Sequence, residues 1–158
     1  NGATNQLTLP DGGSLSVAIP AGIDDGQVLR LRGKGAPAGG EGEPGDALIE
    51  IAVGRHRFFT REGDDIHLDL PITLKEAFLG RRVRAPTPSG AVMLTIPKGA
   101  NSGIVLRLRG KGVQRAGRHG DQLVKLKISL PDQPDPALEA FASSWTPSSD
   151  YEPRRSME

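Results

Sequence analysis

The chain has 158 residues, a length that allows one medium-sized domain or two small ones. It contains 21 glycines and 13 prolines, and so many helix breakers exclude long continuous helices. The 20 basic and 19 acidic residues nearly cancel, whereas dedicated nucleic-acid-binding proteins usually have a clear basic excess. Cysteine is absent, which excludes disulfide frameworks, zinc fingers and thiol catalysis within these residues.

The sequence contains no apolar run of the roughly 18 residues that a membrane span requires. We therefore expect no membrane partner. A chain without cysteine suits a reducing compartment, so the expected location is the cytoplasm. If the chain binds DNA, we expect it to associate with the nucleoid.

An internal repeat is the strongest feature of the sequence. Residues 19–35 read IPAGIDDGQVLRLRGKG and residues 96–112 read IPKGANSGIVLRLRGKG, with twelve of seventeen positions identical. The similarity continues downstream, because Gly45-Asp46 in the first copy corresponds to Gly120-Asp121 in the second. The offset of 77 residues (96 − 19) is the size of a small domain and too long for a solenoid repeat. The sequence therefore predicts two homologous modules in tandem.

Each module is predicted to consist of strands. Residues alternate between apolar and polar at a period of two, and glycine or proline follows each such run, as in strands joined by turns. In the first copy the strands are expected at residues 14–19, 27–32 and 47–53, and in the second at residues 91–96, 104–109 and 122–130.

The second copy has an additional front half. Residues 65–70 alternate as a strand, and Pro71 is expected to end it. Thr73 and Glu76 then have the spacing of a capping box at the start of a short helix, which Gly80 is expected to stop. The first copy begins only at the counterpart of Gly80, so we expect that the chain begins inside its first domain.

The C-terminal residues differ from both modules. Asp135 and Pro136 are typical of a helix N-cap and of the first helical position. The helix that follows places Leu138, Phe141 and Trp145 at spacings of three and four, which gives it one apolar side. The predicted fold is all-β: two tandem homologous β-sandwich-like domains, each with a short helix, and a C-terminal helix. The predicted boundaries are residues 1–62, 63–132 and 133–158.

Few motifs indicate catalysis. The turns at residues 33–35 and 110–112 contain Gly-Lys-Gly, but no helix follows them as it does in a phosphate-binding loop. His67 lies near Asp65 and Asp69 on an alternating strand, a weak metal-site pattern that an ordinary polar sheet face explains better. No nucleophile elbow and no pair of carboxylates stands out. We therefore expect no catalytic residue, no metal site, no cofactor and no enzymatic activity.

Basic residues recur in short runs, of which Arg81, Arg82 and Arg84 are the candidate DNA-binding residues. Arginines at alternate positions of a strand share one face of a sheet, and such a row can contact phosphates. A solvated strand face with neighbouring acidic residues accounts for the same pattern. Aromatic residues, on which single-stranded nucleic acid stacks, are not interspersed among them.

The apolar residues are more informative. Small β modules with one short helix do not bury every apolar face, so some of these residues are expected to form an open groove. A groove beside a strand edge binds extended peptides, because the edge supplies hydrogen bonds that are independent of sequence and pockets take alternate side chains. For any single residue a position in the core is the competing interpretation.

The string V-x-I-P-A-G-x-x-x-G-Q-x-L-R-L-R-G-K-G at residues 17–35 resembles the C-terminal substrate-binding region of DnaJ-type co-chaperones. The run His56-x-x-Phe59-x-Arg61-Glu62-Gly63-Asp64-Asp65 and the stretch LPITLKEAFLG at residues 70–80 are similar to the same family. The resemblance extends over residues 2–145, and the absence of the four-cysteine zinc repeats resembles the zinc-free class, which includes curved-DNA-binding relatives.

The resemblance implies a dimeric clamp that binds non-native polypeptides and delivers them to a DnaK-type chaperone. It places a shallow apolar groove against residues 14–19, and it implies peptide-binding roles for Leu15, Val17, Ile49 and Ile51. It implies a homodimer formed by the helix with Leu138, Phe141 and Trp145. The J domain of the family is not among these residues, so stimulation of the DnaK-type ATPase has to come from outside them.

Two other functions remain open at this point. The first is nucleoid-associated DNA binding through arginine-bearing strands. The second is a purely architectural dimer module whose binding sites lie elsewhere.

Overall fold

The structure is a computed structural model that describes residues 2–8, 12–35, 44–148 and 150–157. The chain forms two compact units, Asn1–Ile128 and Ser129–Glu158. The first unit is built mainly of strands, and the second contains helix α2 (Pro136–Ser144) and the 3-10 turn η1 (Arg155–Met157). The prediction of an all-β fold followed by a C-terminal helix is confirmed.

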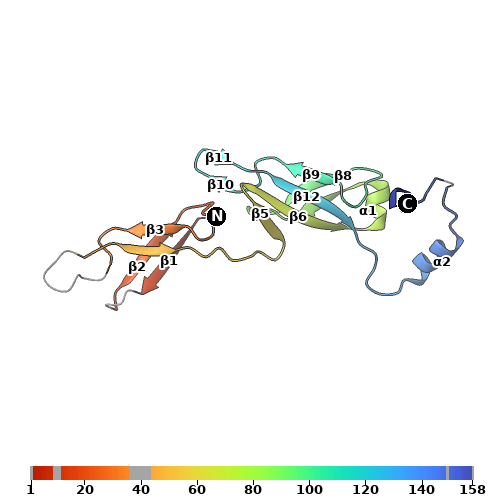
Figure 1. Ribbon diagram of the computed structural model, residues 1–158. Coiled ribbons are helices and arrows are strands. Elements are labelled where there is room, and N and C mark those ends of the chain that lie inside the picture. Colours follow the sequence, from red (N-terminus) through yellow and green to blue (C-terminus); the bar gives the residue numbers. More distant parts are fainter. Residues whose placement is uncertain (1, 9–11, 36–43, 149, 158) are drawn as a thin grey trace. The chain divides into compact units, whose positions relative to one another are not determined.

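The first module consists of two antiparallel strand pairs (Figure 1). β1 (Ala3–Thr8) pairs with β2 (Ser14–Ile19), and β3 (Val28–Leu31) pairs with β4 (Ala47–Glu50). Val17 in β2 is buried, and so is Ile51 directly after β4. No helix is found among the described residues of this module, so of the short helix predicted for each domain only the one in the second module is seen there.

The second module contains a four-stranded sheet in the order β5-β6-β12-β9. Its strands are β5 (Phe59–Glu62), β6 (Asp65–Ile72), β9 (Val105–Leu108) and β12 (Gln122–Ile128). β6 runs parallel to β12, whereas β5 and β9 pair antiparallel to their neighbours. β5 precedes the predicted boundary after residue 62 and is nevertheless hydrogen-bonded to β6, and the boundary itself stays a prediction.

A second layer of this module consists of α1 (Leu74–Leu79) and the hairpin of β7 (Arg81–Ala85) and β8 (Val92–Ile96). A short hairpin of β10 (Gln114–Arg115) and β11 (Arg118–His119) lies before β12. The hydrophobic core joins the two layers, and its buried residues are Leu68, Leu70, Ile72, Ala77, Ala85, Leu94, Ile96, Ala100, Val124 and Leu126. Alternation in β6 and β12 thus gives the sheet one buried face.

The capping box predicted at the start of α1 is confirmed. The Glu76 backbone N–H donates to Thr73 Oγ1 at 3.1 Å, and the Thr73 N–H donates to Glu76 Oε1 at 3.0 Å. Gly80 ends the helix with a φ of 70°, and a Cβ there would lie 2.9 Å from the Ile96 carbonyl oxygen. Gly80 is therefore required both by its conformation and by the close approach of β8.

The expectation that Pro71 ends the strand is wrong. β6 continues to Ile72, and Pro71 lies opposite Lys127 in the parallel pairing. β5 pairs with β6 only as far as Leu68, so beyond that point β6 has no strand on that side among the described residues. An edge without a partner is where a strand accommodates proline, because no N–H has to be donated there.

The N-cap predicted for the C-terminal helix is also found. Asp135 Oδ1 accepts a hydrogen bond from the Leu138 backbone N–H at 3.0 Å, and Pro136 occupies the first turn. Within the described part of the chain, neither helix has the length and apolar character that crossing a bilayer requires.

Candidate functional site

An apolar cavity of about 200 Å³ lies between the β1–β2 pair and β4 in the first module. We call it the β2–β4 groove; it is lined by Asn5, Leu7, Val17, Ile19, Ile49, Glu50, Ile51 and Ala52. Three of the four predicted peptide-binding residues, Val17, Ile49 and Ile51, line it. The fourth, Leu15, lies opposite Leu7 in the β1–β2 pair and is half-buried, but it is not part of the lining.

The second module allows the strand pairing of the two copies to be compared. There β12, the counterpart of β4, pairs with β9 on one side and with β6 on the other. Among the described residues β4 pairs with β3 alone, and Leu48 on its outer face is 70% exposed. β2 lines the groove and pairs with β1 alone among the described residues, just as its counterpart β8 pairs with β7 alone. The groove therefore combines an apolar lining with a strand edge that is unpaired in both copies, the two elements that bind an extended peptide.

The candidate DNA-binding residues do not share one face. In β7, Arg82 and Arg84 lie on the exposed side opposite Thr95 and Met93. Arg81 belongs to the other set of alternating positions, with Val83 and Ala85. All three arginines are exposed. The structure thus brings two of the three together.

The predicted dimerisation residues lie on a helix that is unburied in its own unit. α2 has no buried residue, Phe141 is 55% exposed and Trp145 is 48% exposed, while Leu138 is half-buried. The rings of Phe141 and Trp145 stack with centroids 6.2 Å apart, and Tyr151 meets Trp145 edge-on at 5.7 Å. The sequence did not single out Tyr151, which extends this aromatic surface.

The Gly-Lys-Gly turns do not provide a free anion-binding nest. Asp121 accepts from the Gly110 N–H at 2.7 Å, and the Gly112 N–H donates to the Gly120 carbonyl at 2.9 Å. In the first module Asp46 accepts from the Gly33 N–H at 2.9 Å in the same way. Because these donors are already engaged, the turns are built to hold strands together and not to hold phosphate.

His67 is paired with one carboxylate, not with several. Its Nε2 lies 3.1 Å from Glu62 Oε2 on the outer face of the sheet. Among the residues that the structure describes, no group of three or more histidine, aspartate or glutamate side chains could hold a metal ion.

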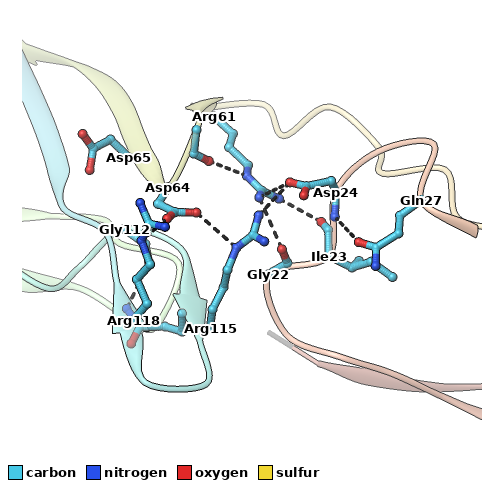
Figure 2. A network of polar contacts seen from close by, with 12 residues as sticks. Gly22, Ile23, Asp24, Gln27, Arg61, Asp64, Asp65, Gly112, Arg115 and Arg118 are labelled. Carbon is cyan, nitrogen blue, oxygen red and sulfur yellow. Dashed lines mark hydrogen bonds and ion pairs between the residues drawn. The ribbon is translucent and has the colours of Figure 1, made fainter. Parts of the chain in front are cut away.

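Sequence reasoning missed a network of charges where the first module meets β5 and the β10–β11 hairpin (Figure 2). Asp24 Oδ1 lies 2.5 Å from Arg61 Nη2 and 2.8 Å from Arg115 Nη2. On its other side Arg115 Nε lies 3.1 Å from Asp64 Oδ1, and Asp64 Oδ2 pairs with Arg118 Nε at 2.8 Å. Acidic and basic groups thus alternate through the network.

The network perturbs two of its groups. The hydrogen bond from Arg115 lowers the pKa of Asp24 below its ordinary value, and Arg61 adds to that effect. The Asp24 carboxylate in turn raises the pKa of Arg115, with a further contribution from Asp64. One sequence signal was available: where the first copy has Asp24, the second copy of the repeat has Asn101.

The chain is similar in sequence to a known family and to several of its members. The family model "DnaJ C terminal domain" matches residues 1–131. A chaperone protein DnaJ from Natronomonas pharaonis is 44% identical over 137 residues, covering 83% of this chain and 36% of the relative. A curved DNA-binding protein from Coxiella burnetii is 39% identical over 143 residues, covering 90% of this chain and 45% of the relative.

A chaperone protein DnaJ from Erysipelothrix rhusiopathiae is 48% identical over 119 residues, covering 74% of this chain and 32% of the relative. The chain thus spans from about a third to less than half of the length of these relatives. The repeated modules, the order of their motifs and the family match agree: the chain belongs to the DnaJ C-terminal domain family.

Proposed function

We propose that this chain is the client-binding and dimerisation part of a DnaJ-type co-chaperone. In this proposal it binds exposed apolar stretches of non-native polypeptides and presents them to a DnaK-type chaperone. The observation that carries the proposal is the β2–β4 groove, whose apolar lining lies beside the unpaired edge of β2. Membership of the family and chaperone relatives support the same role.

Client binding at this groove is expected to be weak and broad in sequence. Backbone hydrogen bonds to a strand edge do not distinguish between sequences, and a cavity of about 200 Å³ takes few side chains at a time. Ordering a flexible client offsets much of the contact energy. Such a site suits a protein that must release its client to a partner.

We propose in addition that the chain forms a homodimer and that its domains end at residues 62 and 132. The exposed aromatic face of α2 supports a dimer, since contiguous exposed apolar surface commonly marks a protein interface. A dimer presents two grooves to one client, and their combined binding exceeds that of either groove alone.

The test is suppression of the aggregation of a chemically denatured client, followed by light scattering. We expect the unchanged chain to suppress aggregation and Ile49→Asp to lose that ability, because the substitution places a charge in the groove lining. Leu48→Asp is the matched control, since Leu48 is the neighbouring residue on the exposed face of β4. Circular dichroism shows whether both variants keep the fold.

If the folded Ile49→Asp variant protects as well as the unchanged chain, the groove is not the client site. If the unchanged chain does not protect at all, the client-binding proposal fails for these residues, and the architectural role or DNA binding takes its place.

DNA binding is the second candidate, favoured by the relative described as a curved DNA-binding protein and by the exposed pair Arg82 and Arg84. Each phosphate contact that releases counterions adds about −0.9 to the slope of log K against log salt. We expect the double substitution of Arg82 and Arg84 by glutamine to flatten that slope. Replacing Arg32 and Arg109, which are exposed elsewhere, is the matched control. Equal slopes for both double variants argue against β7 as the DNA-binding strand.

A further inference from the structure

We propose that an electrostatic clasp holds the loop at residues 22–24 of the first module against the second module, and that high ionic strength opens it. The clasp consists of Asp24, its two partners Arg61 and Arg115, and Asp64 behind Arg115. Arg61 lies on β5, which is hydrogen-bonded to β6, and Arg115 lies in the β10–β11 hairpin. One carboxylate of the first module therefore meets two elements of the second.

The backbone of the loop contributes to the clasp as well. Arg61 Nη1 donates to the Ile23 carbonyl at 2.8 Å, Arg61 Nη2 to the Gly22 carbonyl at 3.3 Å, and Arg61 Nε to the Gly63 carbonyl at 2.9 Å. A single guanidinium thus bridges the loop of the first module and the turn between β5 and β6 (Figure 2). The planar, multiply donating guanidinium suits this role, and lysine could not replace it.

Gly22 shows how closely the loop approaches the second module. A Cβ on Gly22 would lie 2.7 Å from Arg115 Cγ and 2.9 Å from the Gln114 carbonyl oxygen. Its φ of 75° also lies in the region that favours glycine. The loop therefore fits against residues 113–115 only while position 22 has no side chain.

The repeat supplies an internal comparison. The second copy keeps the turn, with Gly99 at the position of Gly22, but has Asn101 at the position of Asp24. Asn101 Oδ1 accepts a hydrogen bond from the adjacent Ser102 N–H and stays within its own loop. The two copies share a turn framework, and the carboxylate occurs in the copy whose loop faces another module.

The linker between the modules makes one hydrogen bond to this loop, from the Val53 N–H to Asp25 Oδ1. Residues 52–58 are all exposed, and part of the linker lines a cavity of about 820 Å³ together with Asp24 and Arg61. A linker that borders open space leaves the two modules free to reorient when their direct contacts break. In this proposal the clasp is the charged contact that holds the orientation of the first module.

The charges of the clasp are accessible to salt. The Asp24 side chain is 57% exposed, so ions screen its attraction to the arginines. The screening length falls from about 10 Å at 0.1 M to about 3 Å at 1 M salt. Without the carboxylate, Arg61 and Arg115 would face each other as like charges, and their repulsion would favour the open joint.

The test measures the distance between two spin labels, one on each module, by pulsed electron paramagnetic resonance. Because the chain has no cysteine, spin labels can be attached at Ser16→Cys and Lys75→Cys without other sites reacting. Both positions are exposed and lie on different modules. We expect a narrow distance distribution at low salt that broadens at 1 M salt. In Asp24→Asn we expect the broad distribution already at low salt.

Asp25→Asn is the matched control. It removes the same charge one residue away, and Asp25 Oδ1 accepts from the Val53 N–H without contacting either arginine. We expect its distribution to stay narrow at low salt. A distribution in Asp24→Asn as narrow as in the unchanged chain overturns the proposal, as does a wild-type distribution that salt leaves unaltered. Circular dichroism on each variant shows that the strands remain formed.

Discussion

Asp121 accepts a hydrogen bond from the backbone N–H of Gly110 at 2.7 Å, and the pairing has a counterpart between Asp46 and Gly33 at 2.9 Å. In each module the same carboxylate also binds an arginine of the preceding strand, Arg107 or Arg30. The Gly-Asp dipeptide that the two copies share thus closes the turn after the repeated strand. This explains why two residues far downstream of the identical segment are repeated with it.

The Asp121 arrangement predicts a dependence of stability on pH. The Gly110 N–H, and after it Arg107, hold the pKa of Asp121 below its ordinary value. A lowered folded-state pKa stabilises the fold above the unfolded-state pKa, and the effect is lost as pH falls through the folded-state pKa. We expect Asp121→Asn to lower the melting temperature at neutral pH, and the difference from wild type to shrink below about pH 4. Asp132→Asn, in the exposed tail, should show no such difference.

The burial of Gln122 predicts a variant, Gln122→Glu, whose stability rises as pH falls, the opposite of the dependence expected from Asp121. Gln122 is fully buried, its Nε2 donates to the Pro86 carbonyl at 2.8 Å, and its Oε1 has no hydrogen-bond partner among the described residues. Gln122→Glu removes the donor and buries a charge, so we expect a loss of at least about 1–3 kcal/mol at neutral pH. Burial raises the folded-state pKa of the new carboxyl, so stability should recover as pH falls. Thermal denaturation across pH measures this, and a pH-independent loss would contradict it.

The capping box of α1 predicts a local loss. Thr73→Ala removes the acceptor for the Glu76 N–H and should cost about 1 kcal/mol of unfolding free energy. Thr73→Ser keeps the oxygen and should be close to wild type. Denaturant titration with both variants separates the cap from a general effect of substitution at this position. A Thr73→Ser variant as unstable as Thr73→Ala would show that the methyl group, not the cap, matters.

The exposed aromatic face of α2 predicts how the proposed dimer is held. Phe141→Asp places a charge beside Trp145 on that face and should shift the chain towards monomer. Ser143 lies on a different side of the same helix, so Ser143→Asp is the matched control. Sedimentation velocity over a range of concentrations measures the shift. Equal association of both variants would place the dimer contact elsewhere.

The strands and caps could be predicted because their signals are local. Alternation along residues 14–19 and the spacing of Thr73 and Glu76 each involve neighbours in sequence, and the structure confirms both. The bonds of the clasp could not be predicted in this way, since Asp24 and Arg115 are 91 residues apart. The sequence signal was the difference between Asp24 and Asn101 in otherwise similar copies, which indicates that the first loop makes a contact that the second does not.

The end of β6 shows a different limit. Proline is usually kept out of paired strands, and the sequence around Pro71 contains no sign that β5 begins only at Phe59, opposite Leu68. Residue 71 therefore needs no N–H for a partner on that side. The groove residues were placed by resemblance, and the structure brings Val17, Ile49 and Ile51 together but leaves Leu15 outside the lining. Their role in binding a client stays a prediction.

The parallel pairing of β6 with β12 has a consequence for synthesis of the chain. Ile66 lies opposite Gln122 in this pairing, so β6 has to wait until more than fifty further residues have been translated. At about 5–20 residues per second this takes several seconds on the ribosome. During that time the nascent chain exposes Ile66, Leu68, Leu70 and Ile72 at alternate positions. Before it is folded, this chain therefore presents an apolar extended stretch of the kind we propose it to bind in other proteins.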